Sequence, residues 1–410
     1  MNRAAVLALG ILAILGGLGL GMFAAIASPP SATHPTGSGL VAGLGSSPPS
    51  FAPLPTPSPS PLLNPSTEPS APPSPSTPPL PTPSPSPRLV PDPLTGRLVT
   101  PAAAARHPIA IMIDDQFDAR PQSGFNAASI VWQAPAEGGI PRYMMIFQEN
   151  IPTDVGPVRS SRYYYIAWAS ELRALYAHAG GSPQALDTLR AQGNGQLVWN
   201  ADEFRWGGSF HRVGPPRFAP HNLFTSGANL RAIAKTVGAR DGPIKWPWTF
   251  ARDAVLGYRP IGGRIIVNYQ ANTVRYDYDR KSNSYLRSVT GEKRQIDAAT
   301  KRRVAPKNVI VMKMVFGPLN DNNPKKHRLE ARIIGSGQAW ISTNGITIAG
   351  TWKKTSTTSP TRFFDRSGRP VVLTIGQTFV QVMKTTDSVS FVRGRPAPPN
   401  PFPIAGLRPR

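Results

Sequence analysis

The hydrophobic pattern opens with an unbroken apolar run from Ala4 to Ala27, which follows Met1-Asn2-Arg3 and contains no charged residue. A run of 24 residues is long enough to cross a bilayer as one helix. Its last residues, Ala25-Ile26-Ala27, also fit a signal-peptidase site, so segment 1–27 is either a retained signal anchor or a cleaved signal peptide. Either way the remainder is exported. It is held on the extracytoplasmic side of a cell membrane by a single N-terminal transmembrane helix, or it is secreted if the signal is cleaved.

Residues 28–93 show no hydrophobic period and hold 23 of the 48 prolines. A Pro/Ser/Thr-rich segment with few large apolar residues cannot bury a core, so we predict a disordered linker. Proline-rich chain favours the extended polyproline form, at about 3.1 Å per residue, so this linker would reach on the order of 200 Å.

From residue 94 to 250, short apolar runs typical of strands alternate with segments whose apolar residues recur at helical spacing. Strands are predicted for PIAIMID (108–114), RYMMIFQ (142–148) and LYAH (175–178). A helix is predicted after each of these strands. The signals are Phe125, Ala128 and Trp132 at i, i+3 and i+7; a cap at Ser160 or Ser161 before Tyr164, Ala167, Trp168 and Leu172; and Ser182-Pro183. This repeated order predicts an α/β layered domain with a mostly parallel sheet.

The second half, 251–390, changes to short β-rich runs, several of them alternating, such as RIIVNYQ, NVIVMKMVF and TFVQVMK. Asn344-Gly345 and the turn from Asp365 to Gly368 are hairpin signals. We therefore predict a mostly antiparallel β module, followed by a flexible tail at 391–410. The predicted fold class is α+β overall, with this module placed after the α/β domain.

Charge separates the same two halves. Residues 94–250 carry 15 basic and 11 acidic side chains, whereas residues 251–410 carry 28 and 9, which gives net charges of +4 and +19. A basic field of this size outside a cell attracts anionic wall polymer, glycan or lipid headgroups, unless it serves only as a solvated surface. Export argues against a specific nucleic-acid partner.

Several chemistries are excluded or disfavoured by composition. The chain has no cysteine, which rules out disulfides, thiolate catalysis and a lipid-modified cysteine. Its six histidines include no pair at a spacing typical of a metal site, so we expect neither a metal nor another cofactor. No Gly-x-Ser-x-Gly elbow and no phosphate loop is present.

Polar residues gather instead after the predicted strands, where ligands bind in sheets of this kind. The candidates for binding an anion, partly at a helix N-terminus, are Arg120, Arg142, Arg159, Ser160, Arg162, Gly180 and Gly181. The candidates for acid or base catalysis are Asp114, Glu137, His178 and His221.

Each candidate also has a purely structural interpretation. Arg159 and Arg162 would then pair with Glu137 or Asp115 to hold the fold, and His178 would be a satisfied buried histidine. Gly180-Gly181 would supply turn conformations, and His221 would belong to a turn and helix cap.

Several stretches resemble the YerB family of bacterial envelope proteins, which has a two-part domain of unknown function. These stretches are DPLTG, PIAIMIDD, ARPQSGFNAASIVWQAPAEGGIPRYMMIF, VGPVRSSR, LYAHAGGSPQA, APHNLFTS, NVIV, GTWKK and FFDRSGRPVVLTIGQTFV. The resemblance spans nearly all of 92–385 and implies a bacterial extracytoplasmic location, with no established activity. Many relatives are lipoproteins anchored through a cysteine, which this chain lacks.

Two functions fit these observations. In the first, the protein is a tethered binder: the arginines of the α/β domain accept an anionic or polyhydroxylated group, and the basic β module docks on the envelope polymer. In the second, it is a hydrolase or transferase acting on envelope glycan or peptide, with Glu137 or Asp114 as general acid or base and His178 or His221 as proton shuttle.

Overall fold

The computed structural model describes residues 88–397, which lie within the unit Thr82–Arg410. The predicted signal or anchor at 1–27, most of the predicted linker at 28–93 and the end of the predicted tail at 391–410 lie outside the described residues. Within the described range, no helix is long and apolar enough to cross a membrane.

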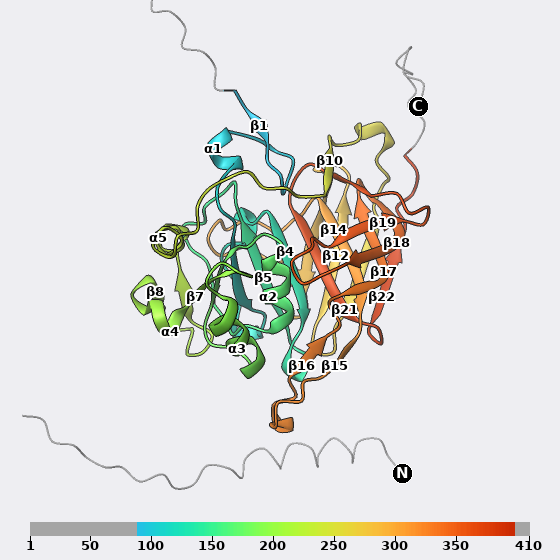
Figure 1. Ribbon diagram of the computed structural model, residues 1–410. Coiled ribbons are helices and arrows are strands. Elements are labelled where there is room, and N and C mark those ends of the chain that lie inside the picture. Colours follow the sequence, from blue (N-terminus) through green and yellow to red (C-terminus); the bar gives the residue numbers. More distant parts are fainter. Residues whose placement is uncertain (1–87, 398–410) are drawn as a thin grey trace, which may run out of the picture. The chain divides into compact units, whose positions relative to one another are not determined.

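A mixed sheet of ten strands forms the centre of this unit (Figure 1). Its strands run parallel at four junctions, β14–β21, β21–β4, β3–β6 and β6–β7, and antiparallel at the other five. In sheet order they are β19 (Arg362–Asp365), β18 (Ile346–Lys354), β17 (Gly335–Thr343), β14 (Asn308–Met314), β21 (Thr378–Lys384), β4 (Ile130–Pro135), β5 (Pro141–Phe147), β3 (Ile109–Asp114), β6 (Leu175–His178) and β7 (Trp199–Asp202).

A second, four-stranded sheet is antiparallel throughout. It consists of β13 (Ser284–Val289), β12 (Thr273–Asp279), β11 (Arg264–Asn268) and β22 (Ser388–Val392). The remaining strands form two-stranded pairs: β1 (Val90–Pro91) with β2 (Leu98–Val99), β8 (Phe210–Arg212) with β9 (Leu223–Thr225), β10 (Thr249–Ala251) with β20 (Val372–Thr374), and β15 (Phe316–Pro318) with β16 (Leu329–Ala331).

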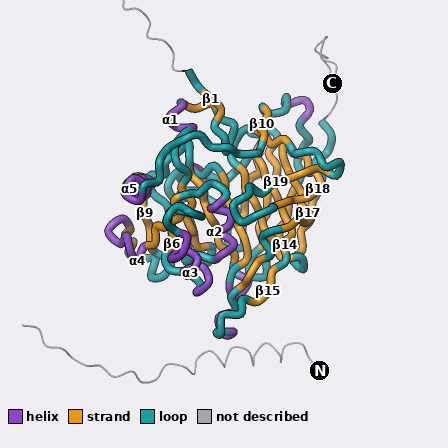
Figure 2. The backbone as a smooth tube through the Cα atoms, in the orientation of Figure 1, coloured by secondary structure: helices purple, strands orange, loops and turns teal. Residues whose placement is uncertain are grey.

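The helices are short and gather mostly on the side of the unit that holds β6 and β9 (Figure 2). They are α1 (Pro101–Ala104), α2 (Tyr163–Ser170), α3 (Pro183–Gln192), α4 (Glu203–Trp206) and α5 (Gly227–Val237). The predicted cap of α3 is confirmed, because the Ser182 hydroxyl accepts a hydrogen bond from the Ala185 amide. The predicted serine cap of α2 is wrong: Arg162 occupies that position and makes no side-chain cap bond.

Both faces of the large sheet are covered, which explains why its central strands are apolar without alternation. In β3, Ala110 and Met112 pack into a core with α2 and α3, whereas Ile109, Ile111 and Ile113 pack into a second core with α5 and the four-stranded sheet. Successive side chains of a strand point to opposite faces, so one short strand supplies both cores.

The predicted fold class is wrong. Strand accounts for 39% and helix for 18% of the described residues, and the main sheet is mixed rather than mostly parallel. The predicted stripe of Phe125, Ala128 and Trp132 forms a 3₁₀ turn (Phe125–Ala127) and strand β4, which pairs antiparallel with β5. All six residues of β4 are buried, so this strand does not alternate between apolar and polar positions. Without that alternation, the spacing of its apolar residues was also compatible with a helix.

The β-rich runs predicted in the second half do contain strands, and the Asn344-Gly345 turn joins β17 to β18. These strands do not form a separate module, however. β14, β17, β18, β19 and β21 extend the same sheet that holds β3 to β7.

Buried polar contacts join the halves, among them those of Lys354 and Arg287. Lys354 Nζ on β18 lies 2.7 Å from Glu171 Oε1 just after α2, with both side chains shielded from solvent. The fully buried Arg287 on β13 donates to Gln133 on β4 at 2.7 Å and to Tyr143 on β5 at 3.1 Å.

Candidate functional site

Four segments meet at the end of β3 and bring most of the predicted site residues together. In the β3–β5 pair, Asp114 lies opposite Arg142. The chain then returns beside β3, where the Arg159 amide donates to the Met112 carbonyl at 2.9 Å. Ser161 next forms a bridge to Gly181, which places the start of α2 against the turn after β6.

Glu137 is held between two arginines. Its carboxylate pairs with Arg162 and, at 3.1 Å, with Arg142. Arg142 also donates to the Ser160 carbonyl at 2.9 Å, and Arg162 donates to the Ser161 carbonyl. Burial acts to raise the pKa of Glu137, but the two arginines outweigh it and hold that pKa below its ordinary value. A carboxylate kept ionised in this way is a poor general acid.

Asp114 forms the second half of the site. Its Oδ2 atom lies 3.2 Å from Arg159 Nε and 2.7 Å from His221 Nδ1. The carboxylate is buried, whereas the arginine side chain remains 24% exposed. Within the described residues, Arg159 has no other side-chain partner, so its two Nη groups are available to a ligand.

The sequence carried no signal that would pair His221 with Asp114, because 107 residues separate them. Neutral imidazole that donates from Nδ1 to Asp114 carries its lone pair on Nε2. No partner of His221 Nε2 is found among residues 88–397. This arrangement is suited to accepting a proton.

The cluster carries more positive than negative charge. Three arginines face the two carboxylates of Glu137 and Asp114, which leaves a net charge of +1 when His221 is neutral. Burial and the neighbouring Arg142 lower the pKa of Arg162 to about 10. The same two causes lower the pKa of Arg159.

His178 takes a structural position. It is fully buried, its Nδ1 lies 2.8 Å from the Gly180 carbonyl, and its Nε2 lies 2.8 Å from Asn200 Oδ1. With both ring nitrogens in hydrogen bonds, the ring has no free atom for proton transfer. Gly180 has a φ of +62°, which favours glycine, so here the turn itself explains the residue.

Arg120 lies outside the cluster. Its Nη2 atom pairs with the buried Asp115 at 3.1 Å, and its Nη1 donates to the Thr290 carbonyl at 2.5 Å. It lines a different cleft of about 350 Å³, together with Phe117 and Asn272.

Two exposed phenylalanines beside the cluster escaped the sequence analysis. Phe204 on α4 is 80% exposed and lies next to Gly180. Phe218 is 67% exposed, and its carbonyl accepts the amide of His221 at 2.8 Å. Neither belongs to a periodic apolar segment, so pattern analysis gave them no weight.

The described residues contain no group of three or more His, Asp or Glu side chains arranged to hold a metal ion. The side chains that meet at the cluster are three guanidinium groups, two carboxylates and one imidazole.

Comparison with known proteins gives two family matches. Residues 94–240 match the model described as "Protein of unknown function (DUF3048) N-terminal domain", and residues 265–380 match the corresponding C-terminal domain.

One relative is found by both the sequence comparison and the structure comparison. The chain is 27% identical over 316 residues to "Putative lipoprotein YerB" of Bacillus subtilis (strain 168), which covers 74% of this chain and 88% of that protein. A crystal structure of YerB from Bacillus subtilis superposes with a TM-score of 0.65 at 25% identity, covering 73% of this chain and 99% of the other.

Proposed function

The chain belongs to the two-part DUF3048 family of proteins of unknown function, and we propose that it binds an anionic group of a cell-envelope polymer or glycan. The observation that carries this proposal is Arg159. Its guanidinium uses only Nε in the fold, stays partly exposed and lies in a cluster with a net charge of +1.

Location supports an envelope ligand. The relative in Bacillus subtilis carries the name "Putative lipoprotein YerB", which favours a membrane-anchored, extracytoplasmic protein. This chain contains no cysteine to carry a lipid. In our proposal the apolar run at 4–27 supplies the anchor, and the proline-rich linker lets the folded unit reach away from the membrane.

Electrostatics favours an anion at this position. A carboxylate or phosphate group beside Arg159 would accept charge-assisted hydrogen bonds from its Nη groups, which contact no acceptor among residues 88–397. It would also offset the repulsion from Arg142, which together with burial lowers the pKa values of Arg159 and Arg162. The net charge of +19 in the second half would draw the polymer toward the protein.

The burial of the three arginines determines which variant is informative. Arg162 and Arg142 have side chains 7% and 12% exposed and hold Glu137, so replacing either would disturb the fold. Arg159→Ala removes the exposed guanidinium, although it also leaves Asp114 with His221 alone. The matched control is Arg190→Ala, which removes a 71% exposed arginine on α3 that pairs only with Asp187.

The test is co-sedimentation of the full chain with isolated bacterial wall polymer and, separately, with vesicles of phosphatidylglycerol, over a salt series. We expect Arg159→Ala to reduce polymer binding about tenfold, as loss of roughly 1.4 kcal/mol would, with Arg190→Ala unchanged. Equal, purely salt-dependent loss in both variants would contradict a specific site. Binding to vesicles but not to polymer would contradict the envelope-polymer ligand.

A second candidate function is hydrolysis of envelope glycan or peptide, which the His221–Asp114 pair favours. In this reaction His221 Nε2 takes a proton from water as the water attacks, while Asp114 orients the ring and stabilises the imidazolium. The imidazolium then gives this proton to the oxygen or nitrogen that leaves as the glycosidic or peptide bond breaks. Glu137 is not the acid, because two arginines keep it ionised. His221→Gln should abolish product release from wall polymer while leaving co-sedimentation intact. Release that survives the substitution would exclude this role.

A further inference from the structure

A cleft of about 620 Å³ lies between the four-stranded sheet and the β17–β18 hairpin, in the basic half of the chain. It shares no lining residue with the arginine cluster at β3. Its volume falls within the roughly 300–1,000 Å³ of typical ligand sites. The cleft is therefore a second place at which the protein can bind a molecule.

Aromatic rings form much of the cleft wall. Trp340 on β17 and Phe391 on β22 are half-buried, and their ring centroids lie 5.5 Å apart. Tyr278 and Tyr285 lie deeper, with centroids 5.2 Å apart. Partly exposed aromatic faces of this kind pack well against the apolar face of a flat ring.

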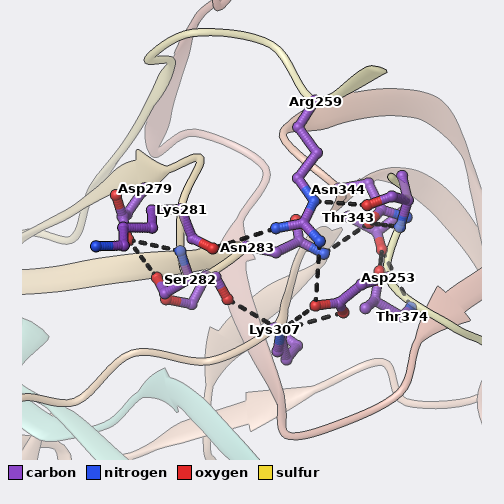
Figure 3. Close-up of polar contacts among 12 residues, drawn as sticks. Asp253, Arg259, Asp279, Lys281, Ser282, Asn283, Lys307, Thr343, Asn344 and Thr374 are labelled. Atoms are coloured by element: carbon purple, nitrogen blue, oxygen red, sulfur yellow. Dashed lines mark hydrogen bonds and ion pairs between the residues drawn. The ribbon is translucent and has the colours of Figure 1, made fainter. Parts of the chain in front are cut away.

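A polar network holds the deeper part of the cleft in place, and Figure 3 shows its contact between Asn283 and Asn344. The Tyr278 hydroxyl donates to the buried Asn283 at 2.6 Å, and Asn283 donates to Asn344 of the β17–β18 turn at 2.7 Å. The Tyr285 hydroxyl accepts from the Gly345 amide at 3.0 Å. Gly345 is required there, because its φ is +75° and an added Cβ would lie 2.4 Å from the Tyr278 ring.

The lining of the cleft is positively charged. Three arginines, Arg264, Arg366 and Arg393, contribute to it, and no acidic residue does. Arg264 pairs with Asp277 at 2.7 Å. Within residues 88–397, neither Arg366 nor Arg393 has a carboxylate at salt-bridge distance, so both can bind a ligand.

We propose that this cleft binds an acidic saccharide, with a sugar ring packed against Trp340 and Phe391 and its carboxylate held by Arg366 and Arg393. Guanidinium groups match the geometry of a carboxylate, which accepts two parallel hydrogen bonds. The ring walls select a cyclic ligand, and the unpaired arginines select an acidic one. The inference does not require an anion at Arg159.

The experiment is calorimetric titration of the full chain with three probes: a galacturonic acid trimer, its methyl ester, and a glycerol phosphate trimer. The ester keeps the rings and removes the charge, whereas glycerol phosphate keeps charge and has no ring. We expect the acid trimer to bind at least tenfold more tightly than either of the other probes.

The variants are Arg366→Ala/Arg393→Ala and Trp340→Ala, with Arg369→Ala as the matched control. Arg369 lies on the same turn as Arg366, is 78% exposed and pairs with Asp365 outside the cleft lining. We expect at least a tenfold loss for the double variant and for Trp340→Ala, and no change for Arg369→Ala.

Three results would overturn the proposal: equal affinity for acid and ester, preference for glycerol phosphate, or unchanged affinity in the double variant. Because Trp340→Ala affects a half-buried residue, circular dichroism and thermal unfolding of each variant accompany the titration. Arg366→Ala/Arg393→Ala changes only exposed side chains, so this variant should fold. It therefore tests the proposal even if Trp340→Ala does not fold. If the titration contradicts saccharide binding in this cleft, the co-sedimentation test of Arg159 still stands. If the co-sedimentation test fails, the titration still decides whether this cleft binds a saccharide.

Discussion

Replacing Lys354 with Met tests whether the two family segments share one core. Lys354 lies on β18, and its partner Glu171 follows α2, so the 2.7 Å pair connects segments 183 residues apart. The side chains are 0% and 1% exposed. Glu171 also accepts from the Thr361 amide at 3.0 Å and from the Thr361 hydroxyl at 2.7 Å.

The expected cost follows from burial. Removing one partner of a buried ion pair leaves the other charge uncompensated, which costs about 3–5 kcal/mol. Since Thr361 keeps two hydrogen bonds to Glu171, we expect Lys354→Met to lower the free energy of unfolding by about 3 kcal/mol. Replacing both residues, as Lys354→Met/Glu171→Gln, should bring stability back to within about 1 kcal/mol of the unmodified protein.

The pH dependence provides an independent check. Burial raises the pKa of Glu171 and lowers the pKa of Lys354. The charge of Lys354 acts to lower the pKa of Glu171, and the charge of Glu171 acts to raise the pKa of Lys354. Without the lysine, the pKa of Glu171 rises further. A raised carboxyl pKa contributes stability that is present below the ordinary pKa and lost as pH rises through the folded-state value. The deficit of Lys354→Met should therefore be smaller at pH 5 than at pH 8.

The assay is urea unfolding of all four members of the double-mutant cycle, monitored by tryptophan fluorescence and by circular dichroism. A coupling energy above about 2 kcal/mol and coincident transitions would support one shared core. A cost below about 1 kcal/mol for Lys354→Met, or two separate transitions, would refute the reasoning.

Three further predictions concern stability. Burial and the nearby Glu149 raise the pKa of Asp92 to about 6, so the ionised form destabilises the fold above that pH; Asp92→Asn should add up to about 3 kcal/mol at pH 7 and little at pH 4, as measured by unfolding at both pH values. Arg287→Met leaves three polar partners of a fully buried guanidinium unmatched and should cost about 3–5 kcal/mol in urea unfolding. Ser182→Ala removes the cap of α3 and should cost about 1 kcal/mol, whereas Ser182→Asp should restore it.

Local signals identified much of the secondary structure. PIAIMID, RYMMIFQ and LYAH form β3, β5 and β6, and Ser182-Pro183 begins α3. These assignments depend on residues close together in sequence, for which periodicity and capping are reliable guides.

Pairing between distant segments could not be read from the pattern. The apolar run of β14 is equally compatible with a separate module and with the central sheet, yet it pairs with β21, which in turn pairs with β4. The choice depends on which face each strand buries, and a run that is buried on both faces carries no such information.

The candidate site was also predicted only in part from the sequence. The sequence indicated Arg142, Arg159 and Arg162 as candidates, and the structure brings them together around Glu137. It could not indicate that His221 would reach Asp114, nor that Arg120 would turn to Asp115, because both contacts depend on how loops close.

The most direct measurement of the central claim is hydrogen–deuterium exchange of the full chain with and without soluble fragments of bacterial wall polymer. The account predicts slower exchange of backbone amides at 156–162 and 179–182, the segments that position Arg159 and the turn beside it. Unchanged exchange in both segments at a fragment concentration that saturates binding would contradict the proposal that the arginine cluster is the binding site.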